Sequence, residues 1–107
     1  MPHYMIQVAY TAQGWANLMK NPQDRVAAVT PAVEKLGGKV EAGYLCFGEY
    51  DVVVIVEMPD NASAAGLAIA FAAGGALRAA KTTPLLTAQE GIEAMKKATA
   101  TGYKPAG

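Results

Sequence analysis

The sequence predicts an α+β fold built on one antiparallel sheet, and three observations lead to this prediction. Within Gly43–Glu57, two apolar runs meet at the turn-forming residues Gly48-Glu49-Tyr50-Asp51, a pattern typical of a β-hairpin. Segments with helical periodicity or many alanines separate the other apolar runs. The chain has 107 residues, of which 52% are hydrophobic and 17% charged, so we expect a single globular core.

The first third of the chain is predicted to form a strand followed by a helix. Aromatic and β-branched residues mark His3–Thr11 as a strand. Gln13–Lys20 is expected to form a short helical turn, after which Asn21 and Pro22 fit an N-cap and a first helical residue. This helix should end at Gly37-Gly38. One face of the strand would carry Tyr4, Ile6, Val8 and Tyr10, and the apolar stripe of the helix would carry Val26, Val29, Val33 and Leu36.

The middle of the chain is predicted to form the hairpin and a second helix. The two strands are expected over Lys39–Gly48 and Asp51–Met58, and Pro59 stops the second because proline has no N–H group for a ladder. A helix over Ala62–Ala73 follows from its alanine content, since alanine has the highest helix propensity. The apolar run ends at Leu77, short of the ~20 residues that cross a bilayer. It is therefore expected to be a buried helix, and no membrane association is expected.

The last third is predicted to add one strand, one helix and a tail. Ala76–Thr83 is expected to be a fourth strand that Pro84 ends. Thr87 and Glu90 fit a capping box, which predicts that a helix begins there. The domain should span residues 1–100, with residues 101–107 as a flexible tail.

The order of these elements is strand, helix, strand, strand, helix, strand and an extra helix. This order is that of the split βαβ, ferredoxin-like fold, in which both crossover helices cover one face of a four-stranded sheet. Side chains alternate between the two faces of a strand, and Val52–Val56 has no polar residue on either face. Both faces of this strand should therefore be covered. We therefore expect a second copy of the chain to cover the open face in a homodimer.

Composition excludes several classes of partner and compartment. Nine Lys and Arg residues balance nine Asp and Glu residues, whereas a nucleic-acid-binding domain usually carries a basic excess, so no nucleic acid is expected. Cys46 is the only cysteine, which rules out an internal disulfide, and it is expected to be buried within its strand. The N-terminal residues lack the features of a signal peptide, and a cytoplasmic location is expected.

A series of short motifs runs in order along nearly the whole chain: Tyr10-Thr11, Gly14, Pro22, Arg25, Leu36-Gly37-Gly38-Lys39, Gly48-Glu49-Tyr50-Asp51 and Glu57-x-Pro59-Asp60. Taken together, these motifs resemble those of GYD-domain proteins. The resemblance implies a place in the dimeric α/β-barrel superfamily, and hence a barrel formed by the sheets of two copies. That superfamily includes cofactor-free monooxygenases, isomerases, haem-dependent enzymes and ligand-sensing domains, but the GYD branch implies no defined activity. The fourth strand departs from the family pattern at Ala79-Ala80-Lys81 and Pro84.

Three residues are candidates for catalysis. Asp51 could act as a general base and Tyr50 could donate a hydrogen bond to an oxyanion. The alternative is that both residues only stabilise the turn, where Asp and Gly are common. His3, the single histidine, could act as a base, or it could lie on the surface or in an interface.

Four residues are candidates for ligand binding. Tyr10, Trp15, Tyr44 and Arg78, with Lys81 nearby, could line a cleft for a small anionic or aromatic ligand. The alternative is ordinary core packing of the aromatic residues, with Arg78 in solvent. No group of His, Cys or acidic residues has the short spacing of a zinc site, so no metal or other cofactor is expected.

The function that these observations favour is binding of a small organic molecule by a homo-oligomeric domain. The alternatives are a cofactor-free enzyme of the monooxygenase or isomerase type, which would use Tyr50, Asp51 or His3, and a purely structural oligomerisation module. The sequence alone does not determine which of these three holds.

Overall fold

Four strands form one antiparallel sheet in the computed structural model, which describes residues 1–107. The strands lie in the order β2-β3-β1-β4, so that β1 and β3 are central and β2 and β4 are edges. The elements are β1 (His3–Tyr10), α1 (Ala12–Lys20), α2 (Arg25–Lys35), β2 (Lys39–Leu45), β3 (Val52–Glu57), α3 (Asn61–Ala73), β4 (Leu77–Leu85) and α4 (Ala88–Ala100). The predicted ferredoxin-like arrangement is confirmed, with α1 and α4 added to it.

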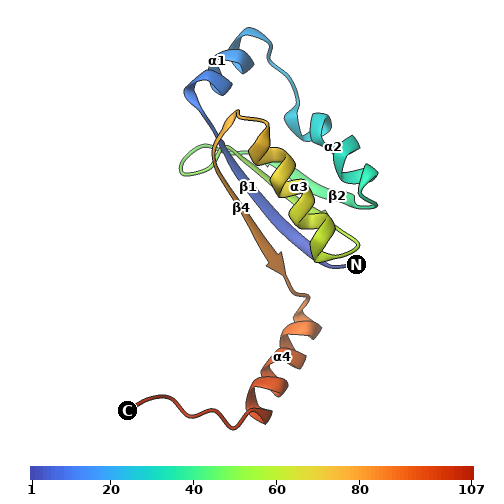
Figure 1. The fold of residues 1–107 in the computed structure, drawn as a ribbon, viewed down its shortest axis with the longest axis vertical. Coiled ribbons are helices and arrows are strands. Elements are labelled where there is room, and N and C mark those ends of the chain that lie inside the picture. Colours follow the sequence, from blue (N-terminus) through green and yellow to red (C-terminus); the bar gives the residue numbers. More distant parts are fainter.

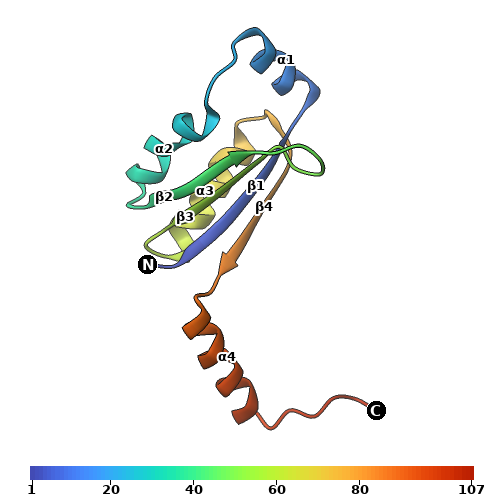
Figure 2. The same ribbon diagram turned by 180° about the vertical axis from the view of Figure 1, so that it is seen from behind.

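The helices α2 and α3 cover one face of the sheet (Figure 1), while the opposite face carries no helix (Figure 2). We call this second face the open face. Right-handed crossovers place both connecting helices on the same side, as the strand order predicts. The layer between helices and sheet is therefore the site of the core.

The core consists of the alternate residues of the two central strands together with residues of the helices above them. The face of β1 that was predicted to be apolar is buried, as are the facing residues of β3. Because side chains alternate along a strand, the neighbouring residues Val53 and Ile55 point to the open face and are half-buried in the single chain. The largest fully buried side chains are Ile6, Met58, Leu67, Val33 and Val56.

The β2–β3 hairpin is shorter than predicted. The Cys46 N–H group donates to the Asp51 carbonyl at 2.7 Å and closes the ladder, so the strands end at Leu45 and begin at Val52. The loop between them contains Gly48, whose φ of +140° is accessible mainly to glycine. Cys46 therefore lies in the loop and is half-buried, and the prediction of a buried cysteine within a strand was wrong.

The first two helices also differ from the prediction. Instead of a single turn, α1 is a nine-residue helix that begins at the N-cap Thr11. Asn21 was expected to start the second helix but is the C-cap of α1, where its N–H group donates to the Asn17 carbonyl. Asp24 caps α2 in its place, because its carboxylate accepts the Ala27 N–H group at 3.0 Å. The predicted end of α2 is confirmed by Gly37, which has a φ of +82°.

The third helix is exposed on more of its surface than was predicted. Only Ala64 and Leu67 are buried in α3, and Ile69 is 68% exposed. In a fold of two layers a helix contacts the sheet along one stripe, so an almost entirely apolar helix still has one uncovered side. Asp60 is the N-cap of α3, and the hydrogen bond from the Ser63 N–H group lowers the pKa of its carboxyl.

Pro84 does not end the fourth strand, contrary to the prediction. It lies within β4, opposite Tyr4 of β1. Proline is tolerated there because β4 is an edge strand, which has a free side where no partner strand requires an N–H group.

The last helix lies apart from the rest of the fold. The predicted capping box of Thr87 and Glu90 is present at its start. None of the residues of α4 is buried, and Figures 1 and 2 both show the helix projecting beyond the end of the sheet. The molecule is accordingly elongated, with extents of 57 × 36 × 22 Å. None of the helices combines the length and the continuous apolar character that crossing a bilayer requires.

Candidate functional site

A pocket of about 430 Å³ opens where β1 ends, between α1, the start of α2 and the β2–β3 hairpin. Its lining includes Tyr10 at the end of β1, Trp15 and Leu18 of α1, and Arg25 and Val26 of α2. We call it the aromatic pocket. A second pocket of about 230 Å³ adjoins it over the helix-covered face of the sheet, between α2 and α3. Tyr10, Arg25 and Val52 line both, so these three residues lie where the pockets meet.

The aromatic wall is formed by Tyr10 and Trp15, whose rings meet edge to face. Their centroids are 5.2 Å apart and their planes differ by 75°, an arrangement that aromatic pairs prefer. Trp15 lies in the first turn of α1, because Thr11 caps that helix immediately after β1 ends. The wall is thus positioned by the strand-to-helix junction.

Asp51 holds the backbone of this wall in place. Its carboxylate accepts the Tyr10 N–H group at 2.9 Å, and its own N–H group donates to the Val8 carbonyl at 2.8 Å. The residue is buried, and these bonds extend the β1–β3 pairing to the residue that immediately precedes β3. The sequence analysis gave stabilisation of the turn as the alternative to catalysis by Asp51. The structure shows a stabilising role of this kind, but the N–H group that Asp51 accepts belongs to Tyr10 of β1 and not to the turn.

Arg25 is the cation of the aromatic pocket. It is half-buried, and one of its terminal nitrogens donates to the Gln23 side-chain carbonyl at 2.9 Å. No carboxylate lies within 4.0 Å of its guanidinium, since both ion pairs of the molecule involve His3. A guanidinium stays charged at all physiological pH values and has five N–H donors, so most of its donors are free for a ligand.

The structure brings together some of the residues predicted to bind a ligand and separates others. Tyr10 and Trp15 share the aromatic pocket, and Tyr44 contributes to its rim. Tyr44 pairs with Val53, however, which places it on the open face, where it is 68% exposed. Arg78 is exposed and donates to the Glu49 carbonyl at 3.1 Å, outside both pockets.

Sequence reasoning named the wrong arginine as the cation of this pocket. Arg25 was quoted only as part of the family resemblance, because the start of its helix was placed three residues too early. The Asp24 N-cap, which precedes Arg25, is the signal that could have placed this arginine in the first turn of α2 and therefore at the end of the sheet.

The three candidates for catalysis do not form one constellation. Asp51 bonds to Val8, five residues along β1 from His3, which corresponds to about 16 Å at the rise of a strand. Tyr50 is half-buried in the hairpin loop, and its carbonyl accepts the Cys46 thiol at 3.2 Å. His3 therefore lies at the opposite end of the sheet from the aromatic pocket.

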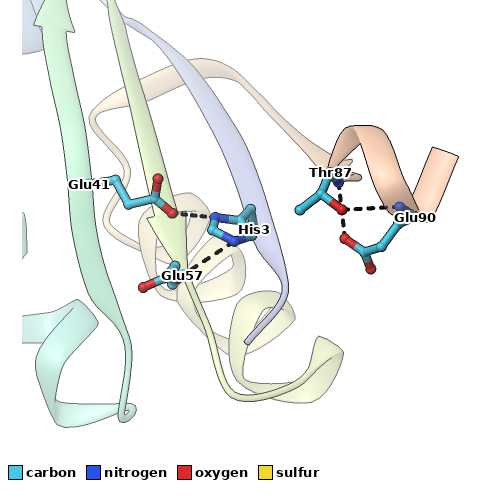
Figure 3. Close-up of polar contacts among 5 residues, drawn as sticks. All are labelled: His3, Glu41, Glu57, Thr87 and Glu90. Carbon is cyan, nitrogen blue, oxygen red and sulfur yellow. Dashed lines mark hydrogen bonds and ion pairs between the residues drawn. The ribbon is translucent and has the colours of Figure 1, made fainter. Parts of the chain in front are cut away.

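A polar cluster surrounds His3 at that opposite end (Figure 3). The imidazole Nδ1 contacts the Glu41 carboxylate, and Nε2 lies 3.5 Å from the Glu57 carboxylate. The first turn of α4 is nearby, where the Thr87 N–H group donates to the Glu90 carboxylate at 3.0 Å. This hydrogen bond is the main cause that lowers the pKa of Glu90, and the field of His3 contributes to the same shift.

The fold and the pocket define a class: a two-layer ferredoxin-like domain with a ligand-sized pocket beside its sheet and one open sheet face. A solved structure described as the crystal structure of FFRP-DM1 has a TM-score of 0.56 with 17% identity, over 80% of this chain and 100% of that chain. This similarity supports the fold alone. The GYD domain profile matches residues 4–95, and the chain belongs to the GYD domain family.

A curated relative supports the same assignment. The glutamine synthetase and cystathionine beta-lyase binding protein of Thermus thermophilus is 33% identical to this chain over 79 residues. The match covers 73% of this chain and 82% of the relative. The resemblance predicted from the motifs is therefore confirmed at the level of the family.

Proposed function

We propose that this chain binds a small organic anion with an aromatic or aliphatic body in the aromatic pocket. The observation that carries the proposal is Arg25, a half-buried guanidinium without a carboxylate partner, at the junction of two mainly apolar pockets. Pockets for small molecules typically combine apolar walls with a few polar groups that orient the ligand. The Tyr10–Trp15 pair supplies the wall, and Arg25 supplies the group that would select a carboxylate.

The proposal includes a homodimer formed through the open face. The centre of this face carries Met5 and Ile55, which lie side by side on the central strands and are only half-buried in the single chain. Contiguous apolar residues on a sheet face are typical of interaction sites. A second copy is the occupant that the resemblance to GYD-domain proteins, and through them to the dimeric α/β-barrel superfamily, implies. The cytoplasmic location expected from the sequence belongs to this proposal as well.

The chain provides its own fluorescent reporter for the ligand. Trp15 is the only tryptophan, and it lines the aromatic pocket. Phenylacetate and its neutral isostere phenylacetamide form a matched pair of probes, because they differ mainly in the charge that Arg25 would recognise. Titration of both compounds at millimolar concentrations, followed by Trp15 emission, should show saturable binding that is tighter for phenylacetate.

The two arginines of the chain provide a matched pair of variants. Arg25→Gln should weaken phenylacetate binding by roughly 10- to 100-fold, since a hydrogen bond to a charged group contributes about 1.5–3 kcal/mol. Binding of phenylacetamide should change little. Arg78→Gln removes the other arginine, which lies outside both pockets, and should leave both probes unaffected. Equal binding of the two compounds, or a larger effect of Arg78→Gln, would contradict the proposed role of Arg25.

A second candidate function is binding to another enzyme. The name of the Thermus thermophilus relative, a binding protein for glutamine synthetase and cystathionine beta-lyase, favours it. Size-exclusion chromatography of this chain mixed with each of those two purified enzymes would test it directly. Co-elution with either enzyme would support this candidate, and separate elution from both would count against it.

A further inference from the structure

We infer that His3, Glu41 and Glu57 form a binding site for a first-row divalent transition metal ion such as Zn²⁺. One residue comes from each of three adjacent strands, β1, β2 and β3, and the side chains converge on the open face (Figure 3). One ligand atom from each residue lies within 4.8 Å of the other two. The cluster is at the opposite end of the sheet from the aromatic pocket, so this inference does not depend on ligand binding in that pocket. It shares the open face with the proposed homodimer interface.

The backbone of the sheet positions these three side chains. His3 and Glu57 are direct partners across the β1–β3 pair, so their side chains lie next to each other on one face. On β2, the register shifts between Val40 and Ala42, and Glu41 is the residue at this irregularity. A bulge of this kind changes the direction of a side chain. The result is a Glu41 carboxylate that contacts the imidazole, although Glu41 has no direct partner on β3.

The donor set matches the proposed class of ion. Imidazole nitrogen is a ligand for zinc and its neighbours in the first row, and carboxylates complete such sites in many proteins. Three protein ligands leave at least one coordination position for water or a ligand. Calcium prefers six to eight oxygen ligands, and a site with one nitrogen and two carboxylates does not provide them.

Charge and access both favour the ion. The two carboxylates of the cluster supply negative charge that favours a cation, and the Glu90 carboxylate lies nearby. Lys39 is the partner of Glu57 across the β2–β3 pair but forms no ion pair with it. In the single chain the three side chains are 29%, 35% and 28% exposed, so an ion can reach them in the free subunit without any opening of the fold.

This inference departs from the expectation that the chain holds no metal. That expectation rested on the absence of ligands at short spacing in the sequence. The three residues are far apart along the chain, and only the strand order β2-β3-β1 makes them neighbours. Short-spacing rules apply to sites built on one loop or helix and do not detect a site built across a sheet.

Isothermal titration calorimetry of the untagged full chain with ZnCl₂ tests the site. We expect one Zn²⁺ per chain. His3→Gln, Glu41→Gln and Glu57→Gln should each weaken Zn²⁺ binding by at least roughly 10-fold. Loss of a residue that only supports a metal ligand already lowers metal affinity by about this factor, so loss of a ligand should lower it at least as much. Glu49→Gln is the matched control, because Glu49 is an exposed glutamate in the hairpin loop, away from the cluster. Far-UV circular dichroism should show that all four variants keep the fold. Substitution with Cu²⁺ should give an electron paramagnetic resonance spectrum with hyperfine splitting from one nitrogen.

The possible results separate this site from its alternatives. No saturable Zn²⁺ binding would overturn the inference and leave the cluster as a set of hydrogen bonds and ion pairs. Binding that is lost in His3→Gln but retained in both cluster glutamate variants would also overturn it, because the ion would then be held by His3 and the chain terminus. Loss of binding in all three cluster variants, with Glu49→Gln unchanged, would establish the site.

Discussion

Lysine substitutions at two neighbouring positions of β3 separate the core of the subunit from the proposed interface. Val54 points to the helices and is 3% exposed, whereas Ile55 points to the open face and is half-buried in the single chain. The substitutions Val54→Lys and Ile55→Lys introduce the same side chain on the same strand. They differ only in the face of the sheet that receives the charge.

The expected magnitudes follow from these two environments. Val54→Lys loses the stabilisation of about 1.5–3 kcal/mol that burial of the valine side chain contributes. It also forces an ammonium group toward an apolar core, which destabilises the folded state by several kcal/mol more. A chain of this length is expected to have a total stability of about 5–15 kcal/mol, so a large part of the Val54→Lys protein should be unfolded. Ile55→Lys should change the stability of the isolated subunit by about 1 kcal/mol or less.

The effect of Ile55→Lys should instead appear in the assembly. A two-fold interface contains each residue twice, so the dimer would lose two isoleucine side chains, or about 3 kcal/mol. This corresponds to roughly 100-fold weaker association. Urea unfolding monitored by circular dichroism measures the stability of the subunit. Sedimentation equilibrium over a range of protein concentrations measures the association constant.

Three results would refute this reasoning. If Ile55→Lys associates as tightly as the unmodified chain, the open face is not the interface. If Val54→Lys is as stable as the unmodified chain, the assignment of Val54 to the core is wrong. If the unmodified chain is a monomer at every concentration, there is no homodimer to disrupt.

Three further predictions concern local hydrogen bonds. Asp51→Ala should destabilise the fold by about 1–3 kcal/mol in urea unfolding, because the Tyr10 N–H group loses its acceptor in a buried position. Asp51→Asn retains an acceptor oxygen and should recover part of this loss, and equal losses in the two variants would show that the hydrogen bond is not the cause. Thr87→Ala removes the cap of α4 and should reduce helical circular dichroism while leaving the main unfolding transition in place, since no residue of α4 is buried. The pKa of Glu90 is lowered from 4.5 by the hydrogen bond from the Thr87 N–H group, so its contribution is present above that pH and is lost as the pH falls through the lowered pKa. Acid titration of the unmodified chain should therefore show partial melting of α4 below pH 4.5, and a Glu90→Gln variant that keeps the same acid step would contradict this assignment.

Much of the fold could be predicted because its signals are local in the sequence. The pattern of residues along β1 identified the face of that strand that is buried, whereas β3 is apolar on both faces and was predicted to be covered on both. Thr87 and Glu90 lie within one helical turn of each other, and Gly37 ends α2 through its own backbone conformation. Each of these features depends on residues a few positions apart, so the sequence is sufficient to predict them.

The candidate site was predicted only in part. Tyr10 and Trp15 were correctly placed together because they flank the junction between β1 and α1, a short distance along the chain. Arg25 was missed because α2 begins later than the Asn21-Pro22 signal indicates, and that signal ends α1 instead. Local capping patterns compete with one another, and the packing of both helices against the sheet decides which of them is used.

The sequence by itself therefore determined the order of the elements, the apolar face of β1 and the family. Only the tertiary structure decided that Pro84 lies within a strand, that Arg25 is the cation of the pocket, and that His3 meets two glutamates. The physical reason is the same for all three. Each of these three features depends on which strands and helices lie next to one another in the fold. The elements that become neighbours are far apart in the sequence. Their positions follow from the strand order and the register of the whole sheet.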